Sequence, residues 1–205
     1  TGIQRSSATP KYADTTTSPA GKAVPGKQQN RKDLTSVMVN HHLPYVAQSA
    51  ITQNFKDLSE KAEKAIYTEG PCFLNVLAPC PRGWRYNQDE LLTISQIAVD
   101  TCFWPLYEVV DGEYHLTYKP KEKKPIEEWL KIQGRFKHVL NDPEKVAEIQ
   151  AEVDRRITSA LKKQEERFKK QQTEAEKLRN MDENEKKIYE LEQRELAIAE
   201  KEIIK

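Results

Sequence analysis

The sequence predicts an α/β fold in which a partly parallel sheet is followed by a long charged helix. Strand-like and amphipathic helical segments alternate between residues 44 and 110, as is typical of strand–helix–strand units. The pair Asp111-Gly112 separates two strand-like segments and predicts a hairpin. After Pro143 the chain has neither glycine nor proline and is rich in Glu, Lys, Gln and Ala, which favours helix.

The first third of the chain is expected to be a loop followed by a short helix. Residues 1–32 are rich in Thr, Ser, Pro, Gly and Lys and show no helical or strand period, so they predict an irregular connection. The Asp33 carboxylate can cap a helix that buries Leu34, Val37 and Met38 on one face. We assign the His41-His42 pair at the end of this helix to C-terminal capping rather than to catalysis.

The middle of the chain carries the predicted sheet. Pro44–Gln48 has the pattern of a short strand, and the apolar run Cys72–Ala78 is typical of a strand buried on both faces. Between them, Gly70 should end a helix whose apolar residues have helical spacing. These residues are Phe55, Leu58, Ala62, Ala65 and Ile66.

The sheet should be completed by a helix and a hairpin. A helix from Asp89 to about Asp100 is expected to bury Leu92, Ile97 and Ala98. The hairpin strands are residues 106–110 and 113–118, and both residues of the intervening turn need positive φ.

The C-terminal segment has an interrupted heptad pattern. Alternating steps of four and three join Ile157, Leu161, Gln164, Phe168, Gln171, Ala175 and Leu178. Two glutamines on this seam weaken it, and residues 180–184 break it before Ile188, Leu191 and Ile198 partly restore it. A solvated charged helix is favoured, and a coiled coil stays open.

Composition restricts the class of protein. Charged residues make up 32% of the 205 residues, hydrophobic residues 37%, and the formal net charge is +1. This charge provides no field for nucleic acid or an anionic membrane, and no apolar run approaches the roughly 20 residues that span a bilayer. We therefore expect a cytoplasmic protein with no nucleic-acid or membrane partner. Cys72, Cys80 and Cys102 lack CxxC spacing, which argues against a disulfide framework or a self-contained zinc site.

Several motifs occur in a characteristic order. They are Thr1-Gly2-Ile3-Gln4, Thr15-Thr16-Thr17-Ser18-Pro19, Leu77-Ala78-Pro79-Cys80-Pro81-Arg82-Gly83-Trp84 and Glu128-Trp129-Leu130-Lys131-Ile132-Gln133-Gly134-Arg135-Phe136. Together they resemble the C-terminal half of the beta subunit of the 2-oxoacid:ferredoxin oxidoreductases, of which the pyruvate enzyme is the best-known member. The resemblance extends to about residue 140, and no family is recognised after about residue 160.

The resemblance implies the C-terminal half of a doubly wound domain that binds thiamine pyrophosphate. Residues 1–118 would form this partial domain, with 1–32 as the cofactor loop, 119–141 as a C-terminal arm and 142–205 as a helical extension. The family's Gly-Asp-Gly magnesium segment is not in this sequence. We therefore expect a chain that begins within the domain, and we expect thiamine pyrophosphate, Mg²⁺ and a 4Fe-4S cluster to require the N-terminal half.

The resemblance also implies specific site residues. Thr1, Gly2 and Gln4 would lie beside the diphosphate and substrate, and Cys80 would be the fourth ligand of the 4Fe-4S cluster. Pro79 and Pro81 restrict the backbone around Cys80, although the residues alone leave open a small buried packing residue.

Other candidate side chains receive structural roles. The hydroxyls of Thr15 to Ser18 could approach an anion, but we interpret Lys22 and Lys27 as solvated. Cys72 and Cys102 are assigned to packing. The tryptophans Trp84, Trp104 and Trp129 are assigned to packing and subunit contact, with Trp129 as an anchor of the C-terminal arm on another surface. No catalytic residue is assigned.

The implied activity is oxidative decarboxylation of pyruvate or a related 2-oxoacid to acyl-coenzyme A, in anaerobic metabolism. Coenzyme A and the 2-oxoacid would be substrates, and the alpha and other subunits and ferredoxin would be partners. We expect the chain to be inactive alone. The alternative is a non-catalytic interaction module that assembles through its C-terminal helices.

Overall fold

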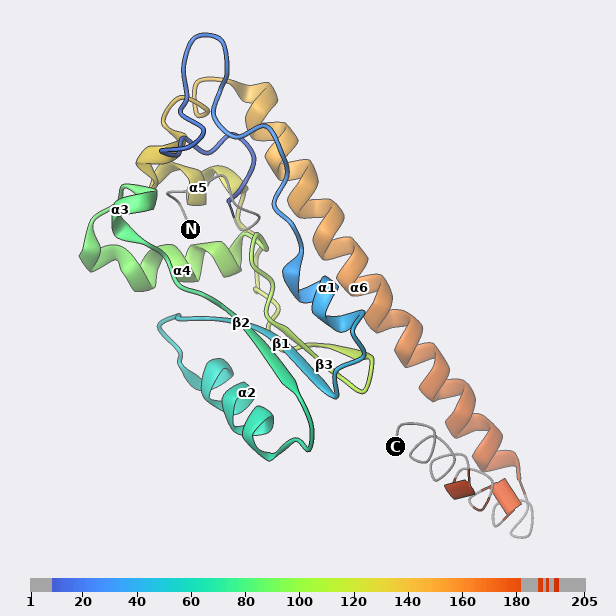
Figure 1. Ribbon diagram of the computed structural model, residues 1–205. Helices are drawn as coiled ribbons and strands as arrows, with labels where there is room; N and C mark the ends of the chain where they lie inside the picture. The colour runs from blue at the N-terminus through green and yellow to red at the C-terminus, as the bar shows by residue number, and fades with distance from the viewer. Residues whose placement is uncertain (1–8, 182–187, 190, 192–193, 196–205) are drawn as a thin grey trace. The chain divides into compact units, whose positions relative to one another are not determined.

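The computed structural model describes residues 9–181, 188–189, 191 and 194–195 (Figure 1). The chain divides into two compact units, 1–164 and 165–205. Its elements in order are α1 (Leu34–Val39), β1 (Tyr45–Ala50), α2 (Lys56–Tyr67), β2 (Cys72–Leu77), α3 (Pro81–Trp84), the 3-10 helix η1 (Gln88–Glu90), α4 (Leu91–Asp100), β3 (Tyr107–Val110), β4 (Glu113–Leu116), α5 (Ile126–Lys131), the 3-10 helix η2 (Gly134–Phe136) and α6 (Pro143–Asn180). The α/β class is confirmed.

The sheet has four strands in the order β2-β1-β3-β4 and is mixed (Figure 1). β1 and β2 are parallel, whereas β3 is antiparallel to β1 and β4 to β3. Asp111 and Gly112 have φ of 48° and 83°, so the predicted hairpin turn is confirmed. Helices α1 and α2 cover opposite faces, because Gln48 of β1 contacts α1 whereas the adjacent Ser49 contacts α2. This arrangement is compatible with a doubly wound domain.

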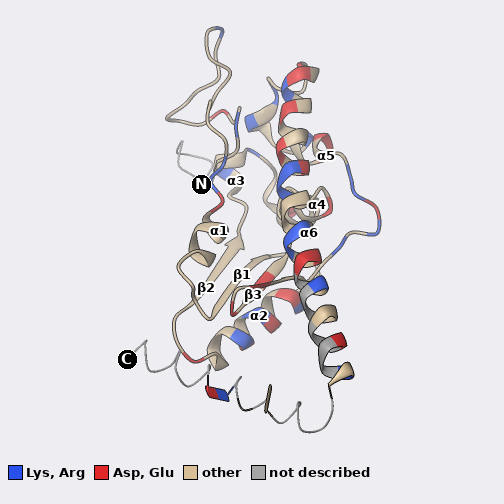
Figure 2. Ribbon diagram, turned by 90° about the vertical axis from the view of Figure 1, so that its right-hand side faces the viewer, with Lys and Arg blue, Asp and Glu red and all other residues tan. Residues whose placement is uncertain are grey.

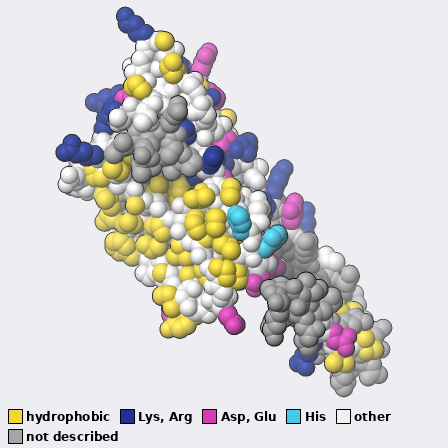
Figure 3. Space-filling model, viewed as in Figure 1, with side chains coloured by type: hydrophobic (Ala, Val, Ile, Leu, Met, Phe, Trp, Pro, Cys, Tyr) yellow, Lys and Arg dark blue, Asp and Glu magenta, His cyan; other side chains and the backbone are white. Residues whose placement is uncertain are grey.

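Strand β2 differs from its prediction. Its apolar sequence indicated burial on both faces, but residues 72–76 are only half-buried. The prediction is wrong because β2 lies at the edge of the sheet and pairs only with β1. Hydrophobic side chains gather over this part of the molecule (Figure 3).

Helix α1 begins where predicted but buries other residues. The Asp33 side chain accepts a hydrogen bond from the Ser36 amide at 3.1 Å, which confirms the cap. Leu34 and Val37 are exposed, contrary to prediction, and Thr35 is buried in their place. The reason is that Gln48, buried on this face of β1, accepts a hydrogen bond from the Thr35 hydroxyl at 2.7 Å.

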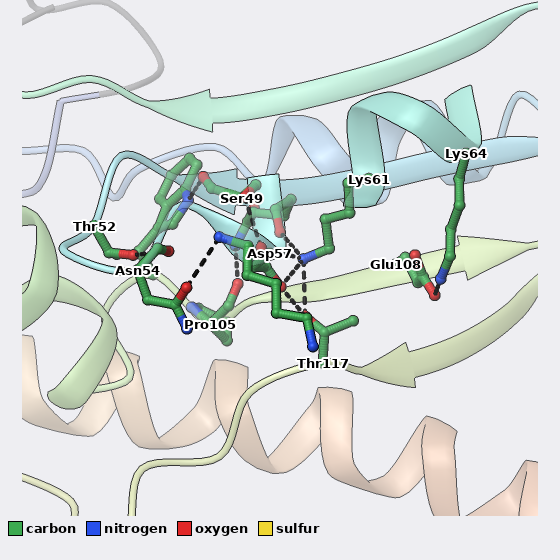
Figure 4. Close-up of polar contacts among 12 residues, drawn as sticks. Ser49, Thr52, Asn54, Asp57, Lys61, Lys64, Pro105, Glu108 and Thr117 are labelled. Atoms are coloured by element: carbon green, nitrogen blue, oxygen red, sulfur yellow. Dashed lines mark hydrogen bonds and ion pairs between the residues drawn. The ribbon is translucent and has the colours of Figure 1, made fainter. Parts of the chain in front are cut away.

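Helix α2 turns a lysine toward the sheet. Its predicted apolar stripe is partly solvent-facing, with Ile66 77% exposed, whereas Lys61 is buried. The Lys61 ammonium donates to the Gln48 carbonyl, the Asp57 carboxylate and the Thr117 hydroxyl at 2.8–2.9 Å (Figure 4). These acceptors come from β1, from one turn earlier in α2, and from the residue after β4, so the contact joins three parts of the fold.

The main core lies at the end of the sheet, between the sheet and the helices α3, α4 and α5 and among these helices (Figure 1). Trp129 of α5 is fully buried and stacks on Phe103 at 4.0 Å between ring centroids. Trp84 meets Trp129 edge-on at 5.6 Å. Packing is thus confirmed for Trp84 and Trp129, whereas their predicted subunit contact stays a prediction. In α4, Ala98 is buried as predicted, but Leu92 and Ile97 are only half-buried.

Helix α6 spans Pro143–Asn180, within the segment where a long helix was predicted, and it ends where the predicted interruption begins. Ile149 and Val153 of its first turns are buried in the main core. Side chains of both charge signs follow one another along it (Figure 2). The predicted domain boundaries at residues 118 and 141 and the coiled coil stay predictions, and Phe168 on the heptad seam is exposed.

Across the described residues, no helix combines the length and apolar character needed to cross a membrane.

Candidate functional site

Cys80 lies where the chain leaves the sheet and turns into a helix. β2 ends at Leu77, and Cys80, in extended conformation, is the N-cap of α3. Its Sγ accepts a hydrogen bond from the Gly83 amide at 3.4 Å, and Pro81 occupies the first helical position. The sulfur is half-buried and acts as the cap of α3, which is compatible with a packing role and with a thiolate ligand.

A cavity of about 200 Å³ adjoins Cys80. It lies beside the carboxyl end of β2 and is lined in part by Ala78, Trp84, Phe103, Trp104 and Arg135. Aromatic rings form much of its wall, so a group bound here would contact mainly apolar surface.

Arg135 brings a buried positive charge to the same cavity. It is 1% exposed, and its guanidinium lies 4.1 Å from the Trp84 ring centroid. Its Nε donates to the Gln133 side chain at 2.7 Å, but its Nη2 has no hydrogen-bond partner among the described residues. Burial lowers the pKa of this guanidinium well below its usual value. An uncompensated cation is costly in an apolar site, which favours a negatively charged group beside it.

The other cysteines lie apart from this cavity. Cys102 is buried in the main core, and burial raises the pKa of its thiol, so its predicted packing role is confirmed. Cys72, at the edge of the sheet, is only half-buried. In the described part of the chain, no three His, Cys, Asp or Glu side chains form a group that could hold a metal. A cluster at Cys80 would thus take its other ligands from elsewhere.

The N-terminal loop reaches the same region. The Asp14 amide donates to the Arg135 carbonyl at 2.9 Å, and Pro10 lines the cavity. Thr1, Gly2 and Gln4, predicted to bind thiamine pyrophosphate, lie outside the described residues.

One lysine prediction in this loop is wrong. Lys22 is exposed as expected, but Lys27 is buried and donates to the carbonyls of Thr9 and Asn30. The loop folds back on itself here, with the Lys27 amide bonded to the Ala13 carbonyl at 3.1 Å, and so supplies acceptors for the ammonium group.

Known proteins with similar sequences were found for this chain. No family model matches it. It is 47% identical over 159 residues to pyruvate synthase subunit PorB of Thermotoga maritima, which covers 76% of this chain and 49% of that protein. It is 45% identical over 154 residues to the subunit of the same name from Methanocaldococcus jannaschii, covering 75% of this chain and 51% of the relative.

The chain is a homologue of pyruvate synthase subunit PorB. The predicted resemblance is thereby confirmed. The chain spans about half the length of the PorB relatives it matches. It is also 40% identical over 144 residues to ketoisovalerate oxidoreductase subunit VorB of Pyrococcus horikoshii, covering 69% of this chain and 46% of that protein. The relatives are thus named for different 2-oxoacids: the PorB subunits for pyruvate and the VorB subunit for ketoisovalerate.

Sequence reasoning missed Arg135 as a site residue. It stands in the segment Gly134-Arg135-Phe136 that contributed to the resemblance, but an arginine between a glycine and a phenylalanine carries no sign of burial in the sequence. A signal exists at Gly134, where a Cβ atom would lie 2.8 Å from the Cβ of Arg85. The Gly134 amide also donates to the Arg85 carbonyl at 2.9 Å, so the backbones next to Trp84 and Arg135 lie close together.

Proposed function

We propose that this chain is part of the beta subunit of a 2-oxoacid:ferredoxin oxidoreductase of the pyruvate type. The observation that carries the proposal is 39–47% identity to PorB subunits over about three quarters of the chain, with Cys80 at a cavity lined in part by aromatic rings. The substrates would be pyruvate or a related 2-oxoacid and coenzyme A. The alpha and other subunits would be its assembly partners, and ferredoxin would accept the electrons.

The residues around Cys80 fit a 4Fe-4S cluster. Cys80 would supply one thiolate, and the Gly83 amide would keep its hydrogen bond to that sulfur. The buried charge of Arg135 would offset part of the negative charge of a thiolate-bound cluster. When bound, the cluster would carry electrons released by oxidative decarboxylation. Thr1, Gly2 and Gln4 are proposed to contact thiamine pyrophosphate, on the resemblance alone.

We further propose that the chain requires the remaining half of the subunit to complete its sheet. The half-buried apolar strand β2 has one edge without a described partner strand, and exposed backbone groups at such an edge invite pairing. Ile66 and Tyr67 of α2, 77% and 82% exposed, add apolar surface close to β2 in sequence. A further parallel strand from the other half would pair with the free edge of β2, and the helices that connect such strands would cover its faces, as the composition of β2 favours.

Substitution of Cys80 tests the proposed function. The chain is coexpressed with the N-terminal half of the Thermotoga maritima PorB subunit, and iron content and electron paramagnetic resonance are measured. We expect Cys80→Ala to abolish or degrade the cluster signal because one of four thiolates is lost. Cys72→Ser and Cys102→Ser are the matched controls and should keep the signal. An intact cluster in Cys80→Ala would refute the assignment.

Thiamine pyrophosphate should not bind this chain alone at micromolar affinity, even with Mg²⁺. The sequence lacks the Gly-Asp-Gly segment that the resemblance assigns to magnesium, so no bound metal ion would neutralise the diphosphate in the cofactor site. Isothermal titration of the full chain, with and without Mg²⁺, measures this. Tight magnesium-dependent binding would contradict the need for a second half.

A further inference from the structure

A second cavity, distinct from the one at Cys80, lies beside the sheet face that α1 covers. Its volume is about 230 Å³, and it is bounded by β3, β4, the start of α1 and residues 155–163 of α6. Four cationic side chains and one carboxylate are among the described residues that line it. These charged residues are Arg31, Arg155, Arg156, Lys163 and Asp33.

Arg31 is the most deeply buried of these cations. It is 8% exposed, and its guanidinium lies 4.8 Å from the Trp104 ring centroid and 5.2 Å from that of Phe103. No carboxylate among the described residues forms an ion pair with it. Burial, with the nearby charge of Arg156, lowers its pKa to about 10, so the group stays charged at neutral pH. The fold therefore keeps a buried charge here without a matching anion.

Arg156 presents a second incompletely used guanidinium. Its Nε donates to Glu152 at 2.6 Å and its Nη2 donates to the Arg31 carbonyl. Its Nη1 is buried without a hydrogen-bond partner among the described residues, and the Asp33 carboxylate is 3.8 Å away. A free donor that is buried in a roomy polar cavity costs stability unless a ligand or water accepts from it.

The nearby carboxylates are already engaged. Glu152 binds Arg155 through both oxygens at 2.8 and 2.9 Å as well as Arg156. Asp33 caps α1 through one oxygen. Lys163, at another side of the cavity, donates to the Tyr114 hydroxyl at 3.0 Å and retains further donor capacity. The cavity thus has an excess of positive charge and of unfilled donors.

We propose that this cavity binds a phosphate group. Guanidinium groups match the tetrahedral oxygens of phosphate with paired donors, and three or more acceptor oxygens can engage Arg31, Arg156 and Lys163 together. The aromatic rings on which Arg31 lies help to bury its guanidinium, which strengthens its attraction for an anion. Inorganic phosphate and a phosphate ester of a larger ligand share this chemistry. The site does not rest on the proposed function.

Isothermal titration of the full chain with inorganic phosphate tests the site, at constant ionic strength maintained with chloride. We expect saturable binding with one phosphate per chain. Arg31→Met and Arg156→Met should weaken it at least about tenfold, which corresponds to about 1.4 kcal/mol. Arg82→Met, an exposed arginine outside the cavity, is the matched control and should bind as the wild type does. If glycerol 3-phosphate binds more tightly than inorganic phosphate, the ligand of this cavity is a phosphate ester.

Thermal unfolding gives a second measurement, which remains informative if one of the variants fails to fold. Phosphate should raise the Tm of the wild type by mass action and leave that of Arg31→Met unchanged. Lys163→Met, at a half-buried position, should fold and show a reduced Tm shift. The proposal is overturned if the wild type shows neither saturable binding nor a Tm shift at millimolar phosphate, or if Arg82→Met loses binding as Arg31→Met does.

Discussion

Replacing Lys61 with Met should lower the free energy of unfolding of this chain by about 3–5 kcal/mol. Lys61 is 1% exposed, and the side chain of its ion-pair partner Asp57 is 17% exposed. The substitution removes the cation and leaves the Asp57 carboxylate with only the hydroxyls of Ser49 and Thr117, both at 2.6 Å (Figure 4). An unpaired buried charge costs more than the lost contact itself.

Urea unfolding of the wild type and variant measures the change. Lys56→Met is the matched control on the same helix: its ammonium is 3.5 Å from Glu60 and its side chain is 74% exposed. The control should change the free energy of unfolding by no more than about 0.5 kcal/mol. The double variant Asp57→Leu/Lys61→Met should recover part of the loss, because neither charge is then buried alone. Equal losses in Lys61→Met and Lys56→Met would contradict the explanation.

The same lysine should contribute to the pH dependence of stability. Burial lowers the pKa of Lys61, although the Asp57 carboxylate opposes the shift. The unfolded chain therefore holds this proton more tightly than the folded chain, so stability should increase with pH as the usual lysine pKa is approached from below. This contribution to the slope should be missing in Lys61→Met.

Truncation after Leu140 should cost more than about 4 kcal/mol, enough to unfold a domain of ordinary stability. The cut removes Ile149 and Val153, which are buried in the main core, and the half-buried Val146 and Ile157 that pack against it. Each fully buried side chain of this kind contributes roughly 1.5–3 kcal/mol. Thermal and urea unfolding of the two chains measure the loss.

Truncation after Gln164 is the control, and it should cost no more than about 1 kcal/mol. The removed unit carries mainly charged side chains, and Phe168, Ile188 and Leu191 within it are exposed. Analytical ultracentrifugation of the same pair addresses the alternative function. Self-association that depends on residues 165–205 would favour an interaction module, whereas equal stability after both truncations would contradict the packing role of Ile149 and Val153.

Features set by short-range backbone chemistry could be predicted from the sequence. The Asp33 cap, the Asp111-Gly112 hairpin and the helix from Pro143 to Asn180 each depend on residues within a few positions of one another. The parallel pairing of β1 and β2 followed from the alternation of strand and helix. The family resemblance could also be predicted, because several motifs had to occur in one order, and a homologue matches 76% of the chain at 47% identity.

Which side chains of each strand and helix are buried could not be predicted from the sequence. Leu34 and Val37 were assigned to a core face and are exposed, because a buried glutamine on β1 requires the polar Thr35 opposite it. The composition of β2 indicates two buried faces, but burial also requires a neighbouring strand on each side. A hydrophobic pattern therefore reports what a segment can bury and leaves open what covers it.

The sequence by itself determined the α/β class, the order of the elements, the relatives and Cys80 as the residue to examine. Only the tertiary structure decided which cations are buried. Arg135 rests against Trp84, Lys61 reaches Thr117 and Arg31 lies over Trp104, each across 50 or more positions of sequence. Whether a charged side chain is solvated depends on the rings and acceptors that such distant segments bring to it, and no local pattern contains that information.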